Sequence, residues 1–92
     1  MPHTSHIHTE QVRVLRDETA HIFLNPWGDA CLVQLSTASG SIWIGEENVD
    51  RFDGFRIPPN SVLPIWLPPS VGIYAVSDRR QGRTLTVMVT HH

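Results

Sequence analysis

The feature that most constrains the fold is a series of short β-forming segments separated by turn residues. The segments are rich in Val, Ile, Thr, Trp and Tyr, which favour strands, and no stretch keeps helical spacing for three turns. Seven or eight short strands in 92 residues predict an all-β antiparallel sandwich or small barrel, with a jelly-roll-like arrangement as one form. The segments are QVRVL (11–15), TAHIFL (19–24), CLVQLS (31–36), SIWI (41–44), GFRI (54–57), SVLPIWL (61–67), VGIYAVS (71–77) and RTLTVMVT (83–90).

Two segments also predict where a strand lies in its sheet or how two strands are connected. Proline cannot donate a hydrogen bond to a strand partner, so Pro64 places 61–67 at a sheet edge or at a bulge. Alternation along that strand puts Leu63, Ile65 and Leu67 on one face and Trp66 on the other. The DRRQG sequence at 78–82 is typical of a hairpin connection between the last two strands.

The chain divides into an N-terminal arm, residues 1–10, and a single β domain, residues 11–92. The arm is polar and shows no periodicity. Only 17% of the residues are charged, against about 25% in an average protein, and a domain of this size is marginally stable alone. Both observations indicate that other protein covers part of the surface and that the chain forms an oligomer.

Charge and hydropathy narrow the partners and the location. The net charge of −2 gives no reason to expect nucleic acid or an anionic membrane as a partner. No apolar run approaches the roughly 18–20 residues that cross a bilayer, and MPHTSHIHTEQ lacks a hydrophobic signal region, so we expect synthesis and folding in a cytoplasm. The single Cys31 excludes an internal disulfide and is expected in the core.

Four carboxylates crowd into the segment IWIGEENVDRFDGFRIPP, at Glu46, Glu47, Asp50 and Asp53. Their spacing fits neither a calcium loop, which needs a closing Glu, nor the separated acids of a glycosidase. We therefore expect an exposed connection, with Val49 and Phe52 tucked under it and a turn at Asp53-Gly54.

Histidines form the other candidate cluster. His3, His6 and His8 could together bind a divalent metal ion, but ordering a mobile arm opposes such a site, so metal binding there is only an outside alternative. His21 is expected on the solvent or interface side of its strand. We expect no cofactor and no catalytic residues, because the chain contains no recognisable nucleophile, phosphate-binding or dinucleotide motif.

Three tryptophans in so small a chain exceed what its core needs, and Trp is enriched at protein interfaces. Trp27, in a turn, and Trp66, beside the Pro-rich bend, are therefore interface candidates. Arg79 and Arg80, in the turn before the last strand, are two more. The rival interpretation is that Trp27 and Trp66 stack against sugar rings.

Several short motifs follow one another in a recognisable order: IWIG at 42–45, GFRIP at 54–58, IYAVS at 73–77 and LTVMV at 85–89. Their order resembles small all-β virion proteins of tailed bacteriophages, including capsid decoration (cement) proteins and head-fibre bases, and the match spans Ile22 to Val89. The chain departs from the pattern in PPNSVLPIWLPP, at 58–69, which is richer in Pro and Trp. This resemblance implies that Gly45 and Gly54 lie in turns and that the core includes Ile42, Ile44, Val49, Phe55, Ile57, Tyr74 and Val76.

The resemblance also implies a function. We expect a non-enzymatic virion protein, displayed on the capsid surface, that clamps neighbouring copies of the major capsid protein or another virion protein. A homo-oligomer is expected, with a trimer favoured. The alternatives are a carbohydrate- or receptor-binding module of a head or tail fibre and, more remotely, a cupin-like metalloenzyme that uses His3, His6, His8 or His21.

Overall fold

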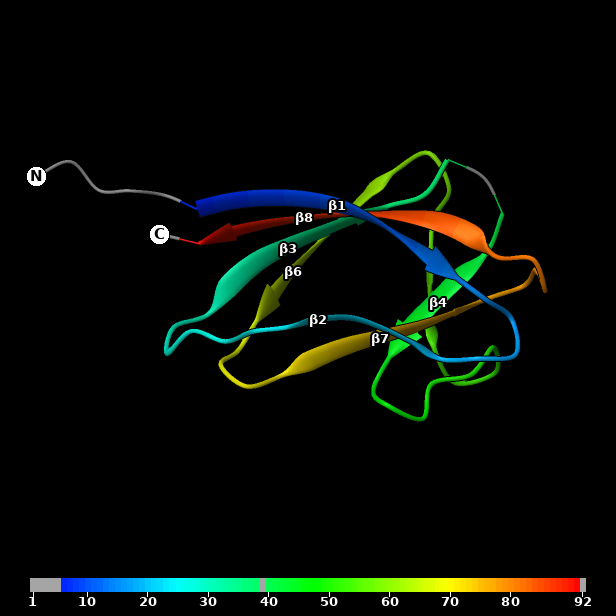
Figure 1. Ribbon diagram of the computed structural model, residues 1–92, viewed down its shortest axis with the longest axis horizontal. Helices are drawn as coiled ribbons and strands as arrows, with labels where there is room; N and C mark the ends of the chain where they lie inside the picture. Colours follow the sequence, from blue (N-terminus) through cyan, green and yellow to red (C-terminus); the bar gives the residue numbers. More distant parts are fainter. Residues whose placement is uncertain (1–5, 39, 92) are drawn as a thin grey trace, which may run out of the picture.

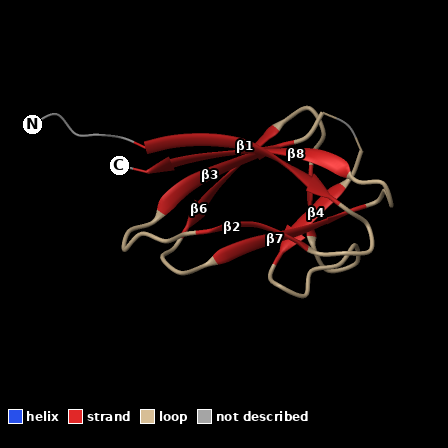
Figure 2. Ribbon diagram, viewed as in Figure 1, coloured by secondary structure: helices blue, strands red, loops and turns tan. Residues whose placement is uncertain are grey.

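The computed structural model describes residues 6–38 and 40–91, and within these ranges the chain forms strands and loops without a helix (Figures 1 and 2). The prediction of an all-β sandwich is confirmed: two four-stranded antiparallel sheets face each other. The strands are β1 (His6–Val14), β2 (Ala20–Leu24), β3 (Cys31–Ser36), β4 (Ile42–Gly45), β5 (Phe55–Ile57), β6 (Val62–Leu67), β7 (Gly72–Ser77) and β8 (Arg83–His91).

The strand pairing follows a simple rule, in which the first strand pairs with the last and so on inward. Thus β1 pairs with β8, β2 with β7, β3 with β6 and β4 with β5. Two further pairings, β3 with β8 and β4 with β7, complete the sheets. The first sheet has the order β1-β8-β3-β6 and the second has the order β2-β7-β4-β5. This is the strand order of a jelly roll, a long hairpin rolled into two layers.

The core lies between the two sheets and is built by alternation along each strand. In β3 the odd-numbered residues point inward and are buried, while the even-numbered residues are half-buried on the outside. Strand β8 follows the same pattern, as the sequence predicted for Leu85, Val87 and Val89. Cys31 is a buried free thiol, as expected, and burial raises its pKa, which keeps the thiol protonated and unreactive.

The predicted arm is too long, because residues 6–10 belong to β1. Each of them is paired with β8, in a register that runs from His6 opposite His91 to Glu10 opposite Val87. Most residues of this segment are polar, and residues 7–10 are all exposed, so the segment shows no buried face that would predict a strand. Its strand conformation comes from backbone pairing with β8, which a hydrophobic pattern does not reveal.

The DRRQG segment is not a hairpin, because β7 and β8 lie in different sheets. It carries the chain from one layer to the other, and an ion pair between Arg83 and Asp78 closes it. The Nη2 atom of Arg83 also donates to Oδ2 of Asp78 at 3.2 Å. Gly40, at a φ of 82°, allows this arrangement, because a Cβ there would overlap the Arg83 guanidinium.

The prediction for Pro64 is confirmed, because β6 is the last strand of the first sheet. Its burial alternates as expected: Leu63 and Ile65 are half-buried and Leu67 is buried, while Pro64 and Trp66 are exposed on the other side.

Candidate interaction surface

The carboxylate-rich loop between β4 and β5 is a folded turn, and all four acids are exposed. Oδ1 of Asp50 accepts hydrogen bonds from the backbone N–H groups of Phe52, at 2.8 Å, and Asp53, at 3.0 Å. The hydrogen bonds from the Asp53 and Phe52 amides hold the pKa of Asp50 below its ordinary value. The carboxylate of Asp50 therefore stabilises the turn of this loop through its hydrogen bonds to the backbone.

The expectation for the apolar residues of this loop is half right. Val49 is buried, but Phe52 is 89% exposed and is not tucked beneath the loop. A Cβ on Gly54 would lie 2.7 Å from Cγ2 of Val49 and 2.8 Å from Cβ of Trp43. Val49 therefore lies against the outer side of β4, where the absence of a side chain at Gly54 makes room for it.

Among the described residues, no three His, Cys, Asp or Glu side chains are grouped so that they could hold a metal ion. His3 lies outside the described ranges, and His6 and His8 are part of β1. Nε2 of His8 lies 3.2 Å from a carboxylate oxygen of Glu10. His21 is exposed, as expected, and lies against Tyr74 with 4.9 Å between the ring centroids.

The fold leaves the outer face of the first sheet bare, and the composition of this face is unusual. The registers place side chains in transverse rows across all four strands. None of these side chains is buried, so no described element covers the face. Its residues are Ile7, Thr9, Gln11 and Arg13 of β1, Thr84, Thr86, Met88 and Thr90 of β8, Leu32, Gln34 and Ser36 of β3, and Val62, Pro64 and Trp66 of β6.

Charge is almost absent from this outer face. Of its described residues only Arg13 is charged; it lies at one end, where its Nε donates to the Gln81 carbonyl at 2.8 Å. Three large apolar side chains are exposed instead: Ile7 at 68%, Val62 at 59% and Trp66 at 68%. Such a surface can be covered by protein without desolvating charged groups.

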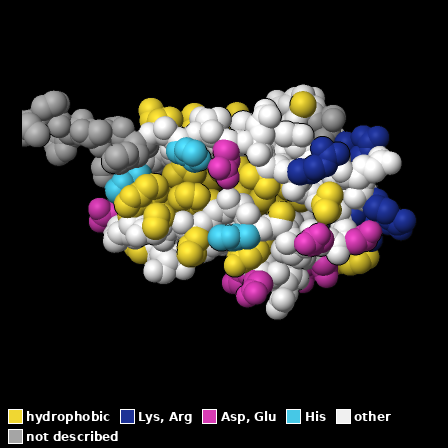
Figure 3. All heavy atoms as spheres, in the orientation of Figure 1, with side chains coloured by type: hydrophobic (Ala, Val, Ile, Leu, Met, Phe, Trp, Pro, Cys, Tyr) yellow, Lys and Arg dark blue, Asp and Glu magenta, His cyan; other side chains and the backbone are white. Residues whose placement is uncertain are grey.

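Charged residues gather elsewhere. In the view of Figure 3, cationic side chains cluster at the end of the molecule opposite the termini, and acidic ones lie mostly along the edge near the second sheet. The predicted interface residues Arg79 and Arg80 are exposed in the connection between β7 and β8. The Nε atom of Arg80 lies 3.5 Å from a carboxylate oxygen of Asp17.

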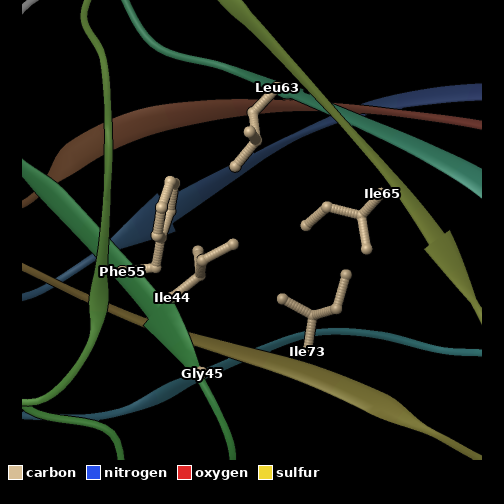
Figure 4. A pocket seen from close by; sticks show the side chains of 6 residues that line it. All are labelled: Ile44, Gly45, Phe55, Leu63, Ile65 and Ile73. Carbon is tan, nitrogen blue, oxygen red and sulfur yellow. The ribbon is translucent and has the colours of Figure 1, made fainter.

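An apolar cavity of about 400 Å³ lies behind β6, on the side of this strand that faces away from the outer face of the first sheet. It lies between the sheets on the side where β6 and β5 are the last strands, and Figure 4 shows Leu63 and Ile65 facing Ile44 and Ile73 across it. None of its six lining residues can serve as an acid, a base or a metal ligand. They are Ile44, Gly45, Phe55, Leu63, Ile65 and Ile73.

The sequence predicted both Trp27 and Trp66 as interface residues, and the structure places them in different surroundings. Trp66 lies on the outer face of the first sheet. Trp27 is half-buried against the core and stacks on His91, with ring centroids 4.1 Å apart and planes 5° from parallel. One face of the Trp27 ring is therefore occupied. The sequence did not single out the face around Trp66 as a whole, although alternation along 83–90 and 31–36 was a signal for it.

Two of the core residues implied by the resemblance are not buried. Phe55 is 58% exposed at the rim of the cavity, because β5 has only three residues and ends its sheet. Tyr74 is half-buried on the outside of the second sheet, opposite His21 and Gly45. Ile42, Ile44 and Ile57 lie in the core between the sheets, as the resemblance implied. Val49 and Val76 are also buried, but they lie on the outer side of the second sheet and are not part of that core.

No helix among the described residues is long and apolar enough to span a membrane.

No protein-family model matches the chain, and no curated protein matches it. The fold is similar to that of a solved structure described in the words "Bacillus endospore appendages form a novel family of disulfide-linked pili". The TM-score is 0.61 at 9% sequence identity, over 95% of this chain and 83% of the other. At this identity the likeness shows a shared fold.

Proposed function

We propose that this protein is a structural, non-enzymatic subunit of a large assembly, held there by protein contacts on the outer face of the first sheet. The observation that carries the proposal is that this face is bare, nearly free of charge and apolar at Ile7, Val62 and Trp66. An exposed apolar patch of this kind marks a contact surface, and Trp is the side chain that most often anchors one.

The specific assembly that we propose is the virion of a tailed bacteriophage, with the protein as a capsid decoration (cement) protein. The resemblance of IWIG, GFRIP, IYAVS and LTVMV to such proteins supports this assignment. The fold shared with a protein described as forming pili is compatible with a subunit that works in many copies. Weak contacts repeated over a lattice stabilise the shell through multivalency.

The experiment is a co-sedimentation assay with mature capsids of the phage whose genome carries the gene. We expect the wild-type protein to pellet with the capsids and Trp66→Ser to bind at least about tenfold more weakly, because Trp66 is the largest apolar side chain on the face. Phe52→Ser is the matched control, since Phe52 is also an exposed aromatic but lies outside the face. Failure of the wild type to bind capsids, or equal losses in the two variants, would contradict the proposal.

A carbohydrate-binding module is the second candidate function, and the exposed ring of Trp66 among neutral Thr and Gln side chains favours it. Sugar rings stack on exposed aromatic faces, and hydroxyl and amide groups bind their hydroxyls. In a glycan array, binding that Trp66→Ala abolishes and Trp27→Ala preserves would support this candidate over decoration. No binding to any glycan would remove it.

A further inference from the structure

We propose that the outer face of the first sheet packs against the same face of a second copy of this chain, related by a two-fold axis. This inference rests on the proposed function and names the partner at that face. The paired copies then form the unit that joins the assembly. Trp66→Ser then weakens capsid binding by separating the pair, because a single copy lacks the multivalency of the paired unit.

The first argument is chemical self-complementarity. In a two-fold contact each surface meets itself, so a charged face would meet its own charges. The described residues of this face have only Arg13, at the far end. The remaining polar groups are Thr and Ser hydroxyls and Gln amides, each of which both donates and accepts hydrogen bonds. Such groups can pair with copies of themselves.

The second argument is the arrangement of the apolar side chains. One transverse row consists of Ile7, Thr90, Leu32 and Trp66, and the next row brings Met88 and Pro64 to either side of Gln34. Apolar side chains thus lie on three sides of Gln34, at Leu32, Met88 and Pro64, and Ser36 lies on the fourth. An axis along the row of Gln34 would place Trp66 against Val62, would bring Met88 and Pro64 against their own copies, and would let the two Gln34 amides bond to each other.

The third argument is area. Four strands about 4.8 Å apart, each with about 3.4 Å per residue, give this face a flat area of about 450 Å². Two copies would bury about 900 Å² of flat area, and the relief of the side chains adds to this figure, so the contact comes close to the roughly 1,000 Å² that a biological interface should exceed. Sheets pack face to face in this way about 10 Å apart.

A two-fold pair also uses this surface more fully than a trimer would. A three-fold ring joins two different patches on each subunit, whereas a two-fold contact joins identical ones. The outer face of the second sheet is smaller, because its strands have three to six residues each, and Val49 lies against part of it. A dimer is therefore expected at this face in place of the trimer that the resemblance favoured.

The test uses the full chain and opposite charges at Gln34. We expect the wild type to sediment as a dimer at micromolar concentrations. Gln34→Glu and Gln34→Arg each bring like charges together near the axis and should weaken dimerisation at least about tenfold. When the two variants are mixed in equal amounts, a heterodimer should form with affinity restored toward that of the wild type.

His21→Glu is the matched control, because His21 is exposed on a strand of the second sheet, away from the proposed contact. It should dimerise like the wild type. Thermal melts must show that each variant is folded. A monomeric wild type, variants of Gln34 that still dimerise, no rescue on mixing, or equal weakening by His21→Glu would each overturn the inference.

The capsid assay separates this inference from the proposed function. A wild-type monomer that binds capsids would overturn the two-fold contact and leave the proposed function in place. A wild-type dimer with rescue on mixing would support the contact even if it bound no capsid, and that result would count against the virion assignment alone.

Discussion

The two sheets have the same number of strands and the same inward alternation, yet their outer faces differ. On the second sheet, Val49 of the β4–β5 loop lies against the outer side of β4 beside Gly54, and Val76 of β7 is only 5% exposed. On the first sheet no described side chain of the outer face is buried. The chain covers part of one face with its own loop and leaves the other bare.

This difference shows how a small sandwich can meet two demands. Covering the second sheet adds buried apolar area, which a 92-residue domain needs. The exposed charged residues of the covering loop make that side of the molecule hydrophilic, which favours contact with solvent. The bare face keeps its apolar side chains and, among the described residues, has Arg13 as its single charge, so it is the side suited to contact with other protein.

The largest effect is expected from two leucines of β3 that point in opposite directions. Leu35→Ala removes a fully buried side chain and should lower the free energy of unfolding by about 2–5 kcal/mol. Leu32→Ala, on the bare face, should cost less than about 1 kcal/mol when measured on dilute protein. Urea unfolding measures both. Equal losses would mean that the outer face is as tightly packed as the core.

A matched pair of valines tests the covering loop, with a smaller effect. Val49 is 7% exposed and Val62, on the bare face, is 59% exposed. Val49→Ala should lower the free energy of unfolding by about 1–2 kcal/mol, and Val62→Ala by no more than about 0.5 kcal/mol. If thermal and urea unfolding gave the same change for both, the proposed difference between the two faces would be wrong.

The smallest effect is a loosening of the connections in acid. The pKa of Asp50 is lowered by the Asp53 and Phe52 amides, and that of Asp78 by Arg83, both from an ordinary value of 3.8. A lowered pKa in the folded state stabilises the fold above pH 3.8 and stops doing so as the pH falls through the folded value.

Titration of the two carboxyl groups by NMR should therefore give midpoints below 3.8. Hydrogen exchange at the amides of Phe52 and Asp53 should accelerate over the same acid range, while amides of β3 stay protected. Midpoints at or above the ordinary value would contradict the hydrogen bonds described for the loop and for the Arg83–Asp78 pair.

Much of the fold was predictable because alternation is a local property. The pattern in 31–36 and 83–90 predicted which side chains are buried, and Pro64 predicted an edge strand correctly. The errors came where pairing or position decides the outcome. Residues 6–10 became strand through β8, and the connection at 78–82 crosses between sheets. Phe55 is exposed because its strand is short and terminal.

The candidate surface was predictable only in part. Trp66 was predicted as an interface residue from its residue type. Leu32, Gln34 and Met88 were not predicted, because nothing in their own segments distinguishes them from other strand residues. They become one surface only when the register places β3 between β6 and β8. Trp27 looked equivalent to Trp66 until its stacking on His91 distinguished them.

By itself, the sequence determined that this protein is made of strands and which side of most strands faces inward, because both follow from the order of residues over a few positions. The tertiary structure decided which strands are neighbours, which loop covers an outer face, and which outer face stays bare. These outcomes depend on pairing between residues far apart in the chain, such as β1 with β8. No local pattern specifies that pairing, because a strand can satisfy its backbone hydrogen bonds with many partners.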